Sequence, residues 1–456
     1  MITRIEAHNY RCFPKLSVGL SRYHVLAGAN GAGKTTFLDI PVLVGDMIRE
    51  RRVVAAFLEQ GEARQVPRAT TLTDLPHKGT GETIGFAFEA KLPEDVREVL
   101  VSLGTAVPSR LIPTHLRYEL RLEVTTRSLS VSDEYLFLFS EDGSRPKSDV
   151  DSEKYKFPQG NPRGDKRLEH ADWQPVILRQ GNSLTRYLPE IETRPASATP
   201  AKPSRQTRRA QPEVRLDIRP IQILPEQLAL GAVPPDRALF PAAVWFMELL
   251  RDDVVFFNPD WDALRSPAPP GYPRRLIASG QNLPWLALDL QNSDPEDFTA
   301  WIDHVRTALP QICDIRAVER EEDHYAYFSV EYEGGYRVTS SGLSDGTLRI
   351  LAITIIPFLP EDAMPGLLVT EEPENGIHPR AIETGVESLS SLFGTQVWVS
   401  THSPIVLAHT QLHDILATRI EEDGRVTVVP GDQHPRLREW QGEADLGTLF
   451  AAGVLS

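Results

Sequence analysis

Cysteine and long hydrophobic runs are both scarce in this sequence. Two cysteines, Cys12 and Cys313, occur in 456 residues, which is too few for a disulfide framework or a cysteine-based metal cluster and predicts a reducing compartment. No apolar stretch approaches the roughly 20 residues that a membrane-spanning helix needs. The first residues lack the basic and apolar segments of a signal peptide. We therefore expect a cytoplasmic protein with no membrane partner.

Positive charge is also in deficit. Lys and Arg number 48 against 63 Asp and Glu, which gives a formal net charge of −15. This balance argues against a uniformly basic surface that coats nucleic acid, although it leaves a local basic patch open. The 41% hydrophobic and 24% charged residues are typical of a globular protein, here of two or three domains. The 37 prolines argue against a long coiled coil.

The sequence does contain a phosphate-binding loop. Residues 28–35, GANGAGKT, match the pattern G-x-x-x-x-G-K-[ST]. An apolar run at residues 24–27 predicts a buried strand before the loop, and residues 36–40 have helical character after it. The glycines let backbone N–H groups turn toward phosphates, and the helix N-terminus adds partial positive charge. Because a glycine-rich turn with a chance lysine would lack these flanks, we interpret the loop as a nucleotide site.

The same loop offers a cation and a metal ligand. Lys34 can reach the β- and γ-phosphates, and the Thr35 hydroxyl can take a position on Mg²⁺. The residues expected to bind the nucleotide here are Asn30, Gly31, Gly33, Lys34, Thr35 and Thr36.

Hydrophobic periodicity predicts the elements of the first half of the chain. We expect strands at residues 2–10 and 16–20, and helices at residues 37–47 and 53–60. Pro41 lies inside the first helix, so a kink or an interruption is expected there. Apolar and charged residues alternate from 116 to 124, which predicts a half-buried antiparallel strand with partners at 83–92, 128–139 and 175–179.

Two stretches read as irregular. Residues 144–167 are rich in Lys, Asp, Gly and Pro and predict a mobile loop. Residues 193–215 combine four prolines with several basic residues, among them Arg205, Arg208 and Arg209. Such composition is typical of a solvated flexible linker. The alternative is an arm that touches the phosphates of DNA or RNA.

Three motifs follow in the second half, where we also expect helices at residues 241–250 and 295–309 and a strand at 325–332. Residues 343–347, LSDGT, open an apolar helix whose N-terminus is suited to phosphate. A buried strand at 366–370 ends in Glu371 and Glu372, and adjacent carboxylates there suit a hydrated Mg²⁺ and the activation of water. Another buried strand, at 396–400, is followed by Thr401, His402, Ser403 and Pro404. Each motif taken alone has a structural alternative. Residues 343–347 can be a plain helix cap, Glu371 and Glu372 part of an acidic loop, and His402 a structural histidine.

The phosphate-binding loop and the three later motifs, taken together and in this order, resemble those of ABC-type ATPases. The resemblance is to the branch that contains RecF, the structural-maintenance-of-chromosomes heads and the OLD-family ATPases. Within it, the chain is similar to predicted bacterial AAA-family ATPases such as those of the Septu and PARIS antiphage systems. LSDGT resembles that group's signature motif, residues 371–379 (EEPENGIHP) its Walker B and D-loop, and residues 401–404 its switch-histidine motif. Residues 280–283 (GQNL) also recur in the group.

The resemblance implies an α/β fold, a P-loop NTPase with an ABC-type ATPase head, an antiparallel β subdomain and a helical signature lobe. The expected divisions are a P-loop half (1–80), the β subdomain (81–190), the linker (191–215), the helical lobe (216–340) and the second half of the ATPase core (341–456).

Roles of single residues also follow from the resemblance. Glu371 would hold Mg²⁺, Glu372 would be the catalytic base and His402 the sensor of the γ-phosphate. Ser344 and Gly346 would contact ATP bound to a second subunit. The resemblance also places residues 9–11 near the nucleotide base, although Tyr10 reads equally well as a core residue. Gln60 and Gln65 are the candidates for the Q-loop glutamine.

The implied protein is an ATP-driven dimerising switch, a homodimer or higher even oligomer, that hydrolyses ATP and regulates a separate effector protein in antiphage defence. DNA repair is the alternative. A transporter's nucleotide-binding subunit fits less well, because the Walker B tail is Glu-Pro-Glu-Asn-Gly and residues 34 and 344 lie far apart. A self-contained OLD-type nuclease is disfavoured because the stretch after His402 is shorter than the roughly 100 residues of an independent domain.

Overall fold

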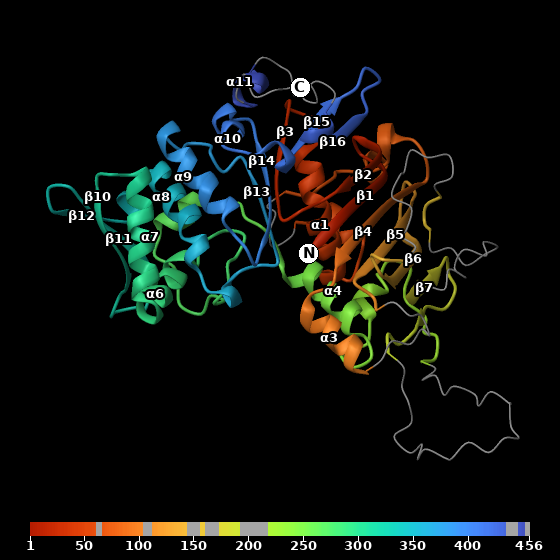
Figure 1. The fold of residues 1–456 in the computed structure, drawn as a ribbon. Helices are drawn as coiled ribbons and strands as arrows, with labels where there is room; N and C mark the ends of the chain where they lie inside the picture. The colour runs from red at the N-terminus through yellow and green to blue at the C-terminus, as the bar shows by residue number, and fades with distance from the viewer. Residues whose placement is uncertain are drawn as a thin grey trace, which may run out of the picture.

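The computed structural model describes residues 1–60, 66–103, 112–143, 156–159, 173–191, 218–434 and 446–451. Two β-sheets enclose the first helices, and a second lobe of helices with a small sheet lies beside them (Figure 1). The predicted α/β fold class is therefore confirmed. The predicted mobile loop, apart from residues 156–159, and the basic linker lie outside the described residues.

A six-stranded sheet forms the centre of the molecule. Its order is β16-β15-β3-β14-β13-β9, and all neighbours are parallel except β15 and β16. The parallel strands are short apolar runs covered on both faces, as expected for buried parallel strands. Their bounds are β3 (Tyr23–Gly28), β9 (Val254–Phe256), β13 (Leu367–Glu371), β14 (Gln396–Thr401), β15 (Ile415–Ile420) and β16 (Val426–Pro430).

A seven-stranded antiparallel sheet lies on the other side of the first helices. Its order is β2-β1-β4-β5-β6-β7-β8. The bounds are β1 (Ile2–Tyr10), β2 (Phe13–Gly19), β4 (Thr83–Lys91), β5 (His115–Val124), β6 (Leu129–Phe139), β7 (Gln174–Gln180) and β8 (Arg186–Tyr187). The strands expected from alternation are confirmed. Because β1 and β2 pair with this sheet, a division at residue 80 separates strands of one sheet.

Helix α1 (Lys34–Arg49) runs between the two sheets and is buried along most of its length. It packs on α4 (Pro241–Asp252) so closely that a Cβ on Gly45 would lie 2.1 Å from the Leu250 carbonyl oxygen. Of the expected kink or interruption at Pro41, the interruption does not occur, because the helix continues through Pro41; packing on both sides offsets the lost backbone hydrogen bond. The shorter helices of this part are α2 (Ala55–Leu58) and α3 (Glu94–Leu103).

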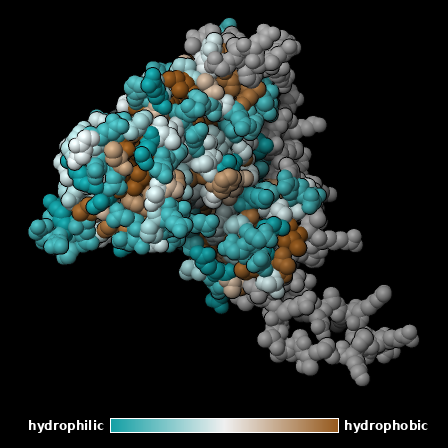
Figure 2. All heavy atoms as spheres, turned by 60° about the vertical axis from the view of Figure 1, so that its left-hand side comes forward, coloured by the Kyte–Doolittle hydropathy of each residue, from teal (hydrophilic) through white to brown (hydrophobic). Residues whose placement is uncertain are grey.

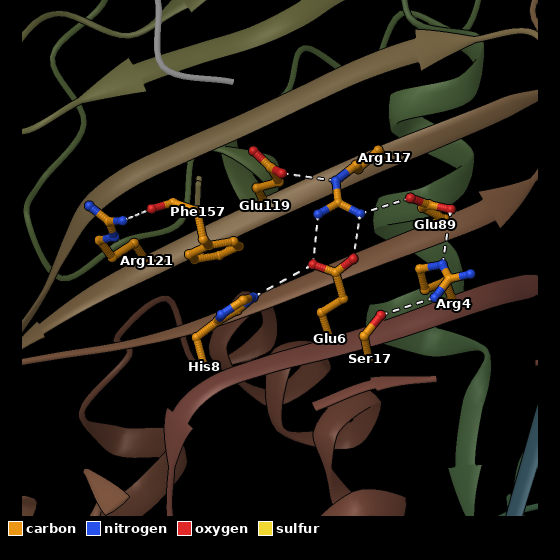
Figure 3. Close-up of polar contacts among 9 residues, drawn as sticks. All are labelled: Arg4, Glu6, His8, Ser17, Glu89, Arg117, Glu119, Arg121 and Phe157. Atoms are coloured by element: carbon orange, nitrogen blue, oxygen red, sulfur yellow. Dashed lines mark hydrogen bonds and ion pairs between the residues drawn. The ribbon is translucent and has the colours of Figure 1, made fainter. Parts of the chain in front are cut away.

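The outer face of the antiparallel sheet carries a buried cluster of charges (Figure 3). The Arg117 guanidinium is fully buried and donates to both carboxylate oxygens of Glu6, at 2.9 and 2.8 Å. It also donates to Glu89 and Glu119, each at 2.8 Å. Phe157 stacks on the neighbouring His8 with ring centroids 4.0 Å apart. Side chains of the same strands that point the other way, such as Leu116 and Tyr118, belong to the hydrophobic core.

The second lobe combines helices with a three-stranded antiparallel sheet, β10-β11-β12. The expected helical lobe therefore contains a sheet that sequence periodicity indicated only at residues 325–332. The elements of this lobe are α5 (Trp261–Arg265), α6 (Leu283–Ser293), α7 (Pro295–Ala308), β10 (Ile312–Glu319), β11 (Ala326–Tyr332), β12 (Tyr336–Thr339), α8 (Asp345–Thr354) and α9 (Pro379–Ser390). The helices α10 (Pro404–Ala408) and α11 (Leu446–Ala451) pack on each other near the central sheet (Figure 1).

The surface that Figure 2 shows is mainly hydrophilic, with apolar atoms in small separate groups. None of the described helices is long and apolar enough to cross a membrane. The longest described helix is α1, with 16 residues, so the described part of the chain contains no long coiled coil, as predicted.

Candidate functional site

Three neighbouring parallel strands end at the same edge of the central sheet. In the order β3-β14-β13, Ala27 pairs with Thr401 and Ser400 pairs with Glu371. The phosphate-binding loop follows β3, Glu371 ends β13 and Glu372 follows it, and His402 follows β14. The carboxyl ends of parallel strands are where α/β proteins bind ligands. Segments from opposite ends of the sequence are thus brought to one site.

The phosphate-binding loop has the backbone that its glycines predict. Gly31 and Gly33 have φ of 77° and 78°, in the left-handed region that glycine adopts without strain. Nothing lies within 4 Å of the position that a Cβ on Gly31 would take. Asn30, Gly31 and Thr35 are exposed and Thr36 is half-buried. The loop is therefore open on the side where an anionic ligand would meet its backbone.

The Lys34 side chain is buried in this loop. Its Nζ donates to the carbonyl oxygens of Gly28 and Ala29, at 2.9 and 3.0 Å. Burial lowers the pKa of Lys34, while the charges of Glu372 and Glu371 oppose that shift. The ammonium group is therefore held by the loop and is close enough to feel the charge of both carboxylates. A cation beside open backbone N–H groups fits the phosphates of a nucleotide.

Glu372 has a strained backbone directly after the strand. Its φ is 43°, and its N–H donates to the Ser400 carbonyl at 2.9 Å. A residue with a Cβ in the left-handed region costs roughly 1–2 kcal/mol. Such strain concentrates at functional sites, where the surrounding structure over-determines it. The sharp turn begins immediately after Glu371, the last residue of β13.

The Glu372 carboxylate is held from two sides. Nδ2 of Asn375 donates to Oε2 at 2.6 Å, and Nε2 of His402 lies 3.2 Å from Oε1. Burial, followed by the charge of Lys34, lowers the pKa of His402, against the effect of Glu372. A neutral imidazole with its proton on Nε2 donates to this carboxylate. The sequence did not single out Asn375; its position three residues after Glu372, in the turn, is the signal that could have found it.

A hydroxyl and a carboxylate of this site have the chemistry that Mg²⁺ prefers. Thr35 is exposed at the start of α1, and Glu371 is the last residue of β13 in the central sheet. Mg²⁺ takes oxygen ligands and keeps several waters, so one or two protein oxygens suffice. The residues present therefore fit the predicted metal, with Thr35 and Glu371 as the residues that would hold it.

The signature residues lie apart from this edge of the sheet. Ser344 caps α8: its Oγ accepts from the Thr347 N–H at 3.2 Å, and its side chain is exposed. Arg265 donates to the Leu343 carbonyl and pairs with Asp345, which braces the turn before the helix. Figure 1 shows α8 in the second lobe, where it packs on α7 and α9, with β13 and β14 between it and α1.

The signature helix does contact the turn that follows Glu372. A Cβ on Gly346 would lie 3.0 Å from the Gly376 carbonyl oxygen, so only glycine allows this approach without a shift. The Arg349 guanidinium, from the next turn of α8, lies 4.1 Å from the Trp261 ring centroid. Gly346 is therefore packed against the turn at Gly376 of the same chain.

Other sequence candidates have structural roles here. Tyr10 is buried against Phe57 and Phe86 in the hydrophobic core, which supports the core reading rather than a contact with a nucleotide base. Asn282 is fully buried, and its Nδ2 donates to the carbonyls of Pro273 and Arg275. Gln60 is exposed after α2, and Gln65 lies outside the described residues. The Q-loop glutamine stays unassigned.

Comparison with known proteins adds a family and several structural likenesses. The family model described as "AAA domain, putative AbiEii toxin, Type IV TA system" matches residues 24–408. No curated protein matches the sequence.

Three solved structures of Smc head domains each align with 94% of this chain. The structure of an Smc head bound to the C-winged helix domain of ScpA has a TM-score of 0.47 and 12% identity, with 97% of that chain covered. The Smc head domain with an extended coiled coil bound to the C-terminal domain of ScpA, derived from Pyrococcus furiosus, has a TM-score of 0.43 and 12% sequence identity, with 95% of that chain covered. The SMC head domain from Thermotoga maritima has a TM-score of 0.37 and 11% sequence identity, with 98% of that chain covered.

Proposed function

Because the chain belongs to the AAA domain family whose model it matches over residues 24–408, we propose that it binds ATP with Mg²⁺ and hydrolyses it. The observation that carries the proposal is the meeting of Lys34, Glu372 and His402 at the ends of three adjacent strands. A cation beside a phosphate loop, a carboxylate and a histidine are the parts that hydrolysis of a phosphoric anhydride needs.

The phosphate loop would bind the substrate. The backbone N–H groups of Asn30, Gly31 and Gly33 would donate to phosphate oxygens, and Lys34 would exchange its two loop carbonyls for the β- and γ-phosphates. This exchange replaces hydrogen bonds to neutral carbonyls with contacts to an anion, so the ammonium gains a Coulomb attraction to the phosphates. Thr36 would contribute from the first turn of α1.

Glu372 would act as the general base. Its carboxylate is positioned by Asn375 and His402 and is one-third exposed, so a water molecule can reach it. The carboxylate would accept a proton as that water attacks the γ-phosphorus, and the bond to the β–γ bridging oxygen would break. When ATP is bound, the Nε2–H of His402 would exchange Glu372 for an oxygen of the γ-phosphate as its acceptor, and bound Mg²⁺ would neutralise charge on the phosphates.

The exposed position of Ser344 supports a site shared between two copies of the chain. Ser344 and Gly346 would complete the phosphate site of a second subunit, so the protein would act as a homodimer or a higher even oligomer. By the resemblance set out above, this dimer would be an ATP-driven switch that regulates a separate effector protein in antiphage defence. DNA or RNA contact through the linker arginines belongs to the same proposal and concerns residues outside the described part.

Separate measurements of ATP binding and phosphate release test the proposal. Lys34→Ala should weaken ATP binding by about 10-fold or more, since a charged hydrogen bond contributes about 1.5–3 kcal/mol. Glu372→Gln should keep binding but lower phosphate release by about 100-fold or more, because the base is lost. Matched controls are Lys15→Ala on β2 and Glu387→Gln on α9, two exposed residues away from the strand ends. Wild-type turnover by Glu372→Gln would refute the assignment of the base.

A further inference from the structure

One buried carboxyl group joins the two loops that carry Glu372 and His402. Glu374 is 9% exposed and lies in the turn after β13. Its Oε1 accepts hydrogen bonds from the Thr401 hydroxyl and from the backbone N–H of His402, the latter at 3.3 Å. The Thr401 hydroxyl in turn accepts from the Ser403 N–H at 2.9 Å. Oε1 of Glu374 thus holds the His402 N–H directly and the Ser403 N–H through the Thr401 hydroxyl.

The surroundings of the Glu374 carboxyl group impose a desolvation penalty on it. Its other oxygen, Oε2, is buried and has no hydrogen-bond partner among the described residues. Burial raises the pKa of Glu374, against the hydrogen bonds from Thr401 and His402. Most side chains around the small cavity beside it are apolar, among them Pro373, Ile377, Val399 and Val406. An apolar residue would avoid the desolvation penalty, so the anchored loop is what the carboxyl group contributes.

We propose that Glu374 is a positioning residue that sets where the His402 imidazole lies relative to the Glu372 carboxylate. The geometry explains how. Glu372 and Glu374 belong to one tight turn, closed by the Asn375 N–H to the Glu372 carbonyl at 3.0 Å and by the Ile377 N–H to the Glu374 carbonyl at 3.0 Å. Fixing His402 to Glu374 therefore fixes it to the turn that carries the base. The inference rests on the proposed function for its effect on catalysis, but not for its effect on structure.

Two variants separate the acceptor from the rest of the side chain. Glu374→Leu has a similar volume but no acceptor, and it should lower kcat by about 10-fold or more while KM for ATP changes little, as for other residues that orient a reacting group. Glu374→Gln keeps an acceptor oxygen and should recover most of the turnover. Thr401→Val removes one donor and should lower kcat less than Glu374→Leu does. In the double variant the two effects should not add, because they act on one contact.

A structural readout tests the position of His402 without any hydrolysis. The proton and carbon chemical shifts of the His402 imidazole, in protein with labelled histidine, can be assigned by their absence from His402→Asn. Glu374→Leu should move these resonances, whereas Glu374→Gln should leave them near their wild-type values. Unfolding midpoints of all variants show whether each one is folded. If Glu374→Leu does not fold, the other two variants still test the role. Thr401→Val should lower kcat, whereas Glu374→Gln should keep most of the turnover.

The results distinguish a failure of the positioning role of Glu374 from a failure of the proposed ATP hydrolysis. Wild-type kcat in Glu374→Leu, equal loss in Glu374→Gln and Glu374→Leu, or unmoved His402 resonances would each overturn the positioning role. If the wild-type protein released no phosphate while the His402 resonances moved as expected, the proposed function would fail and the positioning role would stand.

Discussion

The Nε2 atom of His402 lies 3.2 Å from Oε1 of Glu372, a contact that ties the end of β14 to the turn after β13. Both side chains are about one-third exposed, at 30% and 33%. The pKa of His402 is lowered by burial and by the nearby Lys34 charge, which favours the neutral imidazole. A neutral imidazole gives this contact one donated hydrogen bond, and the ring remains reachable from outside.

Replacement of His402 by alanine is expected to remove a donor aimed at the developing charge. Phosphate release should fall by about 100-fold, the usual cost of one such donor, while ATP affinity falls much less. Single-turnover phosphate release and equilibrium binding of ATP separate the two effects. His409→Ala is the matched control, because His409 ends α10 beside Glu383 and away from the strand ends. Equal rates for His402→Ala and the control would contradict the role.

Mixing two inactive variants tests whether the site is shared between subunits. Lys34→Ala damages the phosphate loop, and Ser344→Arg places a bulky side chain at the exposed cap of α8. In a mixed dimer with shared sites, both lesions fall in one site and the other site is intact. We expect ATP occlusion to return at about one site per mixed dimer. Occlusion is the better measurement, because turnover stays low if both sites must act together.

Subunit exchange has to be shown independently, by mixing differently tagged copies and recovering both tags together. The control mixes Lys34→Ala with Ser341→Arg, a substitution at another exposed serine before α8. Exchanged dimers of Lys34→Ala and Ser344→Arg that occlude no ATP would rule out the shared-site arrangement.

Much of the fold follows from local sequence pattern. The strand β1 occupies the residues that its periodicity predicts, and β13 and β14 follow from short apolar runs. Pairing was not predictable in the same way. Ile5 lies opposite Phe88, far along the chain, and an alternating pattern shows which face is buried but not which strand lies beside it. For that reason the sequence could not place β1 and β2 in the antiparallel sheet.

The candidate site shows the same limit at the level of single residues. Lys34 is predicted because a short motif places it, and its neighbours are local. Glu374 and Asn375 read as members of an acidic loop, and only the fold brings one to Thr401 and aims the other at Glu372. Pro41 shows the opposite case: the local rule allows a kink or an interruption, and the packing around α1 lets the helix continue without an interruption.

The Arg117 cluster makes a strong prediction for stability. Arg117→Met would leave the carboxylates of Glu6, Glu89 and Glu119 without their shared cation in a buried setting. Removing one partner from a buried ion pair typically costs about 3–5 kcal/mol, so the free energy of unfolding should fall by that order. Urea unfolding at neutral pH measures it.

The matched control for Arg117 is Arg127→Met, because Arg127 is exposed in the turn between β5 and β6. That substitution should change the free energy of unfolding by about 0.5 kcal/mol or less. Adding Glu6→Gln to Arg117→Met should restore part of the loss, since it removes one uncompensated charge. A loss no larger than that of the control would show that the cluster is not a source of stability.

A buried carboxyl group at the start of α4 predicts how stability depends on pH. Glu190 is fully buried, and its two oxygens accept from the N–H groups of Ala242 and Ala243 at 2.7 and 2.8 Å. Burial raises the pKa of Glu190 from 4.5 to about 8, against the effect of these two hydrogen bonds. Between these values the folded protein binds more protons at this site than the unfolded protein does. The contribution of Glu190 is therefore complete below about pH 4.5 and decreases as the pH rises toward 8.

Glu190→Gln should remove this dependence. At about pH 5 the variant should be less stable than the wild type by about 1–3 kcal/mol, because an amide nitrogen replaces one acceptor oxygen. The difference should shrink and then change sign toward about pH 8.5, because the wild type alone must ionise a buried group, at about 1.4 kcal/mol per pKa unit over the shift from 4.5 to about 8. Urea unfolding at several pH values and constant salt measures it, with the exposed Glu98→Gln on α3 as the control. Parallel pH profiles for the wild type and Glu190→Gln would show that Glu190 does not titrate in this window, and that the N–H groups at the start of α4 hold it as an anion throughout.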